Sequence, residues 1–129
     1  MKPNYQGVTP YLRSADATKS IDFYKAAFGA IEHDRRAAPD GRIMHCHLEI
    51  NGGPLMLSDA FPDHGYAFEG YKGVMLTLVV ADGQVWWDRA VAAGCEVEMP
   101  FDTQFWGDRY GQFRDPFGVS WAINEAGNN

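Results

Sequence analysis

Residues 45–49, HCHLE, carry the side chains best suited to chemistry, because two histidines and a glutamate occur at every second position. Histidine and glutamate bind metal ions and also transfer protons. Alternate side chains of a strand point to one face, so His45, His47 and Glu49 should lie together and face an open cleft. Ile43 should share this polar face, and the residues expected on the opposite, core-facing side are Met44, Cys46, Leu48 and Ile50.

The trio is a poor chelate for a single ion, because His45 and Glu49 would lie about 13 Å apart along a strand. Adjacent members, about 7 Å apart, could share an ion, but the sequence offers no obvious third ligand. His47 beside Glu49 could instead form a histidine–carboxylate pair for proton transfer, which makes these two the candidate catalytic residues. The same pattern also fits a polar, partly solvated sheet face.

Both halves of the sequence predict a strand, a helix and then three further strands. Helical spacing of apolar residues predicts helices at 16–28 and 83–93. Asp16 suits the N-cap of the first helix, and Gly29 suits its C-terminal cap. The predicted strands are 7–13, 30–38, 42–51 and 54–59 in the first half, and 73–80, 95–102, 108–114 and 118–124 in the second.

Short identities also recur at about half the length of the chain. YQGV at 5–8 returns as YKGV at 71–74, and Asp16 returns as Asp82, each displaced by 66 residues. A displacement of this size predicts two copies of one supersecondary unit.

We therefore expect one domain over residues 1–129, made of a first repeat at 7–59 and a second repeat at 73–124. The loop at 60–72 joins them and is rich in glycine and aromatic residues. Such a loop is expected to pack over a cleft or over a partner subunit.

Composition argues against several classes of partner. The net charge is −6, and no cluster of Lys and Arg exceeds two residues, so nucleic acid is not expected to bind. The sequence has no signal-peptide pattern and no apolar run approaching the about 20 residues of a membrane span, which predicts a cytoplasmic protein. Cys46 and Cys95 lie in apolar contexts typical of reduced core residues.

Several motifs together resemble the vicinal oxygen chelate superfamily of glyoxalases, extradiol dioxygenases, fosfomycin-resistance transferases and bleomycin-binding proteins. They are the duplicated βαβββ pattern, SIDFYKAAFGA on the first predicted helix and DPFG before the last predicted strand. TPYL, HLEINGGPLMLSD and WGDRYGQFRDPFGVSW are most similar to the PhnB-like branch. The resemblance implies an α+β fold in which two βαβββ units form a cupped mixed sheet. It also implies helices on the convex face, a concave cleft for a small molecule, and a homodimer.

Metal-using members of this superfamily place ligands on the first and fourth strands of each unit. The corresponding positions here are Thr9, Met56 or Leu57, Met75 or Leu76, and Ala122. None of these side chains is a competent ligand for a divalent metal, so we expect no metal and no cofactor. Val119, which stands where the PhnB-like pattern tends to have histidine, also departs from the family.

Aromatic residues cluster in MPFDTQFWGDRYGQF, where Phe101 and Phe113 are expected in the core. The candidate ligand-binding residues are Tyr11, His45, Trp106, Arg109 and Tyr110. Trp86 and Trp87 are adjacent on a predicted helix and cannot both face the sheet, which favours a dimer contact for one of them.

Two functions follow from these features. The first is a small-molecule-binding protein of PhnB-like type with a metal-free cleft. The alternative is a glyoxalase-like lyase, isomerase or transferase that uses His47 and Glu49 for acid–base work, with or without a divalent metal. The sequence leaves open whether the protein is an enzyme.

Overall fold

The computed structural model describes residues 7–127 and has an α+β fold. Its backbone forms two compact units, the first ending at Gly70 and the second beginning at Tyr71. Each unit consists of a four-stranded mixed sheet and one α-helix in the order βαβββ, as predicted. The YQGV copy begins at residues 5 and 6, which lie outside the described residues. Across residues 7–127, no helix is long and apolar enough to span a bilayer.

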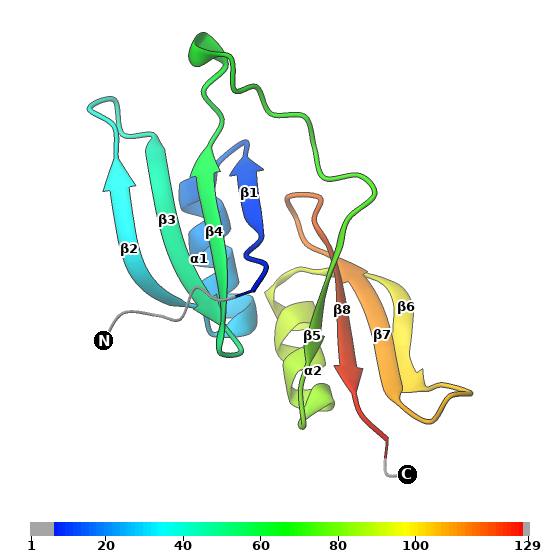
Figure 1. Cartoon of the computed structure of the whole chain (residues 1–129). Helices are drawn as coiled ribbons and strands as arrows, with labels where there is room; N and C mark the ends of the chain where they lie inside the picture. The colour runs from blue at the N-terminus through cyan, green and yellow to red at the C-terminus, as the bar shows by residue number, and fades with distance from the viewer. Residues whose placement is uncertain (1–6, 128–129) are drawn as a thin grey trace. The chain divides into compact units, whose positions relative to one another are not determined.

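The first unit has the strand order β1-β4-β3-β2, with β1 and β4 parallel and the other neighbours antiparallel. Its helix α1 contacts β1, β3 and β4 and covers one face of the sheet, leaving the other face open (Figure 1). The elements are β1 (Tyr11–Ser14), α1 (Ala17–Phe28), β2 (Ile31–Ala37), β3 (Ile43–Ile50), β4 (Gly53–Asp59) and the short 3-10 helix η1 (Pro62–His64).

The second unit repeats this arrangement with the strand order β5-β8-β7-β6, in which β5 and β8 are parallel. Helix α2 contacts β6 and β8. The elements are β5 (Met75–Val79), α2 (Gly83–Ala93), β6 (Glu96–Thr103), β7 (Arg109–Arg114) and β8 (Ser120–Glu125). Both predicted helices and all eight predicted strands are present, with boundaries shifted by a few residues.

The displacement of 66 residues between the two repeats is also found in how the parallel strands pair, β1 with β4 and β5 with β8. Tyr11 pairs with Met56 in the first unit, and Thr77 pairs with Ala122 in the second. Both partners of the second pair therefore stand 66 residues after those of the first. The parallel strands therefore pair in the same register in both units.

The same displacement recurs at the helix starts. The Ala17 backbone N–H donates to Asp59 Oδ1 at 2.7 Å, and the Gly83 N–H donates to Glu125 Oε1 at 2.8 Å. In each unit, a carboxylate at the end of the last strand accepts from the first residue of the helix. This contact satisfies a backbone donor that the helix itself leaves without an intrahelical acceptor.

Helix α1 follows the predicted pattern closely. Asp16 is its N-cap and accepts from the Lys19 N–H at 3.1 Å, while Gly29 ends the helix with φ 64°, in the left-handed region that glycine adopts readily. The predicted apolar stripe is buried and faces the sheet; its members are Ala17, Ile21, Tyr24 and Phe28.

In the second unit the core forms around Trp87, whose ring stacks on Phe101 at 5.5 Å and lies 5.0 Å from the ring of Phe113. Phe113 is fully buried, as expected, and Phe101 is half-buried. Trp86 is also half-buried, and the guanidinium carbon of Arg89 lies over the Trp86 ring at 4.6 Å from the ring centre. The two tryptophans therefore have different environments, which their adjacent helical positions predicted.

Candidate functional site

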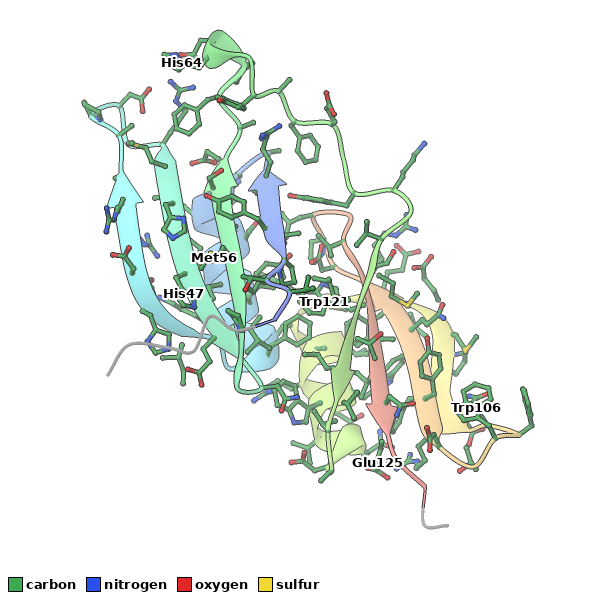
Figure 2. All side chains as sticks on the ribbon, in the orientation of Figure 1. His47, Met56, His64, Trp106, Trp121 and Glu125 are labelled. Carbon is green, nitrogen blue, oxygen red and sulfur yellow. The ribbon has the colours of Figure 1, made fainter. Side chains whose placement is uncertain are left out.

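The open face of the first sheet carries a row of side chains at the level of His47. His47 on β3 pairs with Asp34 on β2 and with Met56 on β4, and Met56 pairs with Tyr11 on β1. Figure 2 shows His47 and Met56 as neighbours on adjacent strands of this sheet. Cys46, which follows the opposite alternation, is fully buried, so the predicted core-facing side of β3 is correct at its centre.

At the start of β3 the predicted alternation is wrong. Met44, expected in the core, is 55% exposed, while Ile43, expected on the polar face, is only 3% exposed. Arg36 pairs with His45 and Ala37 with Ile43, so Met44 is an extra residue on β3. This β-bulge shifts the alternation by one position and brings Met44 to the open side.

His47 is 1% exposed, which corrects the expectation of a solvated histidine. Its ring lies 5.4 Å from the ring of His33, and its backbone lies between two neighbouring strands. Burial lowers the pKa of His47, with smaller contributions from the nearby His33 and His45. A neutral imidazole is therefore the favoured form at this position.

Glu49 does not pair with His47 as predicted. His33 Nε2 donates to Glu49 Oε1 at 2.8 Å, which makes His33 the histidine of the histidine–carboxylate pair. His33 lies between Glu32, which pairs with Leu48, and Asp34, and it is the extra residue of a second bulge. The extra residue of a bulge is defined by pairing with the neighbouring strand, which the sequence of one strand does not encode, so His33 was missed.

The predicted ligand-binding residues Tyr11 and His45 are in contact. The Tyr11 hydroxyl and His45 Nδ1 share a hydrogen bond of 3.2 Å, and the two rings lie 5.7 Å apart. Tyr11 is 51% exposed, so its ring is available on the open side of β1.

Tyr11 also belongs to a pocket of about 710 Å³ in the first unit. The strands contribute Tyr11, Arg13, Met44, Ser58 and Asp59, the β2–β3 turn contributes Ala38, Pro39, Asp40 and Arg42, and the loop after β4 contributes Phe61, His64 and Tyr66. Aromatic and apolar side chains form much of this wall, and a few charged groups interrupt it.

Loop 61–66 closes on itself and forms one side of the pocket. The Phe61 N–H donates to Tyr66 O at 2.7 Å, and the Tyr66 N–H donates to Phe61 O at 2.9 Å. Figure 2 shows His64 on the short η1 helix within this loop. Three residues of the predicted loop 60–72, Phe61, His64 and Tyr66, therefore line the pocket, and packing of this loop against a partner subunit stays a prediction.

Arg42 attaches this loop to the start of the sheet. Its guanidinium donates to both oxygens of Asp63, at 2.8 and 3.0 Å, and its carbon lies 4.2 Å from the centre of the Phe61 ring. Arg42 Nε also donates to Asp40 at 2.9 Å. These bonds lower the pKa of Asp63 to about 2 and lower the pKa of Asp40. One arginine therefore bridges the turn, the strand and the loop.

The other predicted ligand-binding residues lie in the second unit, where two of them are in contact. Trp106 is 45% exposed and meets Tyr110 edge-on, with the ring centres 5.7 Å apart. Arg109 donates to Gln84 Oε1 at 2.7 Å, and its guanidinium lies 4.4 Å from the centre of the Phe101 ring. Trp106 and Tyr110 are thus in contact with each other, whereas Arg109 contacts Gln84 of α2 and Phe101 instead.

The positions that the superfamily resemblance predicts for metal ligands do not suit a divalent ion here. Met56 faces the open side, while Leu57 and Ala122 are fully buried. The Met75 sulfur accepts a hydrogen bond from the Tyr110 hydroxyl at 3.6 Å. A thioether is a soft donor, an aliphatic side chain is no donor, and the lone hydroxyl of Thr9 is too weak to hold a divalent ion. Within residues 7–127, no group of three or more His, Cys, Asp or Glu is arranged to hold a metal ion.

Both cysteines are buried, free thiols. Burial raises the pKa of Cys46 to about 11 and that of Cys95 to about 12. Neither thiol is activated as a nucleophile near neutral pH.

Comparison with known proteins gives consistent matches over nearly the whole chain. The model of the Glyoxalase/Bleomycin resistance protein/Dioxygenase superfamily matches residues 8–123. The protein Mb0911c of Mycobacterium bovis is 39% identical over 124 residues, covering 92% of this chain and 82% of that protein. The crystal structure of PA1353 from Pseudomonas aeruginosa has a TM-score of 0.76 at 29% identity, covering 94% of this chain and 98% of that one. A PhnB protein from Bacillus cereus has a TM-score of 0.74 at 19% identity over 94% and 100% of the two chains, a likeness of fold.

Proposed function

Because the chain belongs to the Glyoxalase/Bleomycin resistance protein/Dioxygenase superfamily, we propose that it binds a small molecule in the pocket of its first unit. A single fold can carry many unrelated functions, so family membership alone does not specify this site. The pocket itself supplies the argument.

The size of this pocket and the side chains that line it are the main support for a small-molecule-binding function. Its volume of about 710 Å³ lies within the range of about 300–1,000 Å³ typical of sites for small organic ligands. Tyr11, Met44, Phe61 and Tyr66 offer aromatic and apolar surface, and Arg13 and Ser58 offer polar contacts. A few polar groups in an apolar wall are typical of a site that fixes a ligand's orientation.

Fluorescence titration with the neutral probe N-phenyl-1-naphthylamine tests the proposal. The variant Met44→Trp adds bulk to the pocket wall and should weaken probe binding by at least about tenfold, a change of about 1.4 kcal/mol. Met99→Trp is the matched control, because Met99 is an exposed methionine outside the pocket lining. Equal affinity in wild-type protein and Met44→Trp, or absence of binding to wild-type protein, would refute the proposal.

The alternative of a lyase, isomerase or transferase that uses His47 and Glu49 has less support. His47 is almost fully buried, and Glu49 accepts from His33. A proton-transfer pair must reach the substrate, and burial of His47 restricts that access.

We further propose that the protein is a PhnB-like homodimer. The similarity of fold to a PhnB protein and the half-buried Trp86 support this proposal. Its cytoplasmic location stays a prediction from the sequence.

A further inference from the structure

We infer that loop 61–66 is a movable wall of the pocket that closes on the bound ligand, and that the ion pair between Arg42 and Asp63, here called the latch, holds it closed. The inference rests on the proposed binding function and adds a control over release of the ligand. It depends on how little of the loop is buried, on what attaches the loop to the sheet, and on which of its side chains line the pocket.

Burial contributes little to the position of this loop. Phe61 is half-buried, and each residue from Pro62 to Tyr66 is exposed. The hydrogen bonds between Phe61 and Tyr66 run in both directions within the loop, so they fix its shape without attaching it to the sheet. Segments with few buried apolar contacts detach at a low cost in free energy. The position of the loop therefore depends on its contacts with side chains outside it.

Two arginines of the first unit supply such contacts. The Arg42 guanidinium donates to both oxygens of Asp63, at 2.8 and 3.0 Å, and its carbon lies 4.2 Å from the centre of the Phe61 ring. The Arg13 guanidinium carbon lies 5.0 Å from the centre of the Tyr66 ring. A bidentate pair between a guanidinium and a carboxylate is both strong and directional. The pair between Arg42 and Asp63 therefore defines the closed position of the loop.

The same loop carries part of the pocket wall. Its side chains Phe61, His64 and Tyr66 line one side of the pocket, and Tyr11 and Met44 line it from the strands. Aromatic side chains supply a large contact area to a bound ring. A bound ligand loses the contacts on one side when the loop detaches, so the strength of the latch sets how fast the ligand leaves.

The latch is accessible to water and can be altered without altering the pocket lining. The side chains of Arg42 and Asp63 are 32% and 53% exposed, so dissolved salt weakens their attraction. Asp40 accepts from Arg42 Nε at 2.9 Å, which keeps the arginine beside the sheet when the loop detaches. Asp63 does not line the pocket, so Asp63→Asn removes the charge of the latch and leaves the lining residues as they are.

Stopped-flow dilution of the complex with N-phenyl-1-naphthylamine measures release of the probe. In Asp63→Asn the dissociation rate should be about threefold higher than in wild-type protein, which corresponds to the loss of one exposed ion pair. Raising the salt concentration should bring the wild-type rate closer to that of Asp63→Asn, because salt screens the pair in wild-type protein.

Asp34→Asn is the matched control, because it removes the same charge from a surface pair with Arg36 on β2, outside the pocket lining. Its dissociation rate should equal that of wild-type protein, and circular dichroism should show that both variants are folded. An unchanged rate in Asp63→Asn, an equal increase in Asp34→Asn, or a ratio of the Asp63→Asn and wild-type rates that does not depend on salt would overturn the inference alone. Absence of probe binding to wild-type protein would instead overturn the binding function, and the inference with it.

Discussion

At the scale of single residues, His47 is held neutral by its surroundings. It is 1% exposed, and burial is the largest cause of its lowered pKa. The unfolded chain therefore binds this proton more readily than the folded protein does. The stabilisation is complete above the unfolded pKa of 6.5 and is lost as the pH falls through the lower, folded pKa.

We expect the free energy of unfolding of wild-type protein to fall more steeply between about pH 7 and pH 5 than that of His47→Gln, which removes this titration. Each unit by which the pKa is lowered contributes about 1.4 kcal/mol to that difference. Urea denaturation at several pH values measures it. His64→Gln, an exposed control on η1, should follow the wild-type slope. Parallel profiles for wild-type protein and His47→Gln would contradict the assignment.

The donor set of the open face also predicts independence from metal. Thr9, Met56, Met75 and Ala122 stand at positions that the superfamily resemblance predicts for metal ligands, and none suits a divalent ion. Treatment with EDTA should therefore leave the affinity for N-phenyl-1-naphthylamine unchanged. Near-stoichiometric zinc, nickel or iron in untagged protein, with probe binding lost on chelation, would contradict this expectation.

Residue chemistry could be predicted from the sequence only where the strand alternation is regular. The alternation correctly placed Cys46 in the core, and the Tyr11–His45 contact joins two predicted ligand-binding residues. The bulges at Met44 and His33 depend on pairing with a neighbouring strand, which local spacing does not encode. For the same reason, the His33–Glu49 pair could not be predicted.

At the scale of elements, Asp59 joins three parts of the first unit. It ends β4 and accepts from the first residue of α1 and the first residue of β3. Glu125 makes the corresponding contact with α2 in the second unit. This contact links the end of the last strand to the start of the helix in both copies of the fold.

Asp59→Ala should lower the free energy of unfolding by about 2–4 kcal/mol, because two buried backbone donors lose a charged acceptor. Asp22→Ala is the matched control, since Asp22 is exposed on α1. Its effect should stay within about 0.5 kcal/mol. Urea denaturation checks both values, and equal effects of the two substitutions would show that the Asp59 contact adds no stability.

The helices and strands were well predicted, because the spacing of apolar residues and the capping residues of helices are signals within a short stretch of sequence. Helix α1 begins and ends within a residue of the predicted range, whereas β1 is shorter than the predicted strand 7–13. The structure of loop 61–66 was not predictable in the same way. Its attachment to the sheet depends on Arg42 and Asp63, which are 21 residues apart in the sequence.

At the scale of the whole molecule, every residue that lines the pocket belongs to the first unit. The ligand-binding residues predicted from the sequence lie in both halves of the chain, because aromatic residues cluster in each half. Trp106 and Tyr110 are in contact in the second unit, and Arg109 contacts Gln84 and Phe101 there. A ligand-binding role for these three residues stays a prediction.

The proposed homodimer is tested by light scattering at micromolar concentration. We expect a mass about twice that of the 14.4 kDa chain. Trp86→Ala should shift the equilibrium towards the monomer if this half-buried ring contributes to the interface. A wild-type monomer under these conditions would contradict the proposal.

The most direct test of the pocket assignment is a crystal structure of the protein bound to N-phenyl-1-naphthylamine. We predict that the ring system lies between Tyr11 and Met44 on the strands and Phe61 and Tyr66 on the loop. A probe bound elsewhere while this pocket stays open to solvent would contradict the assignment.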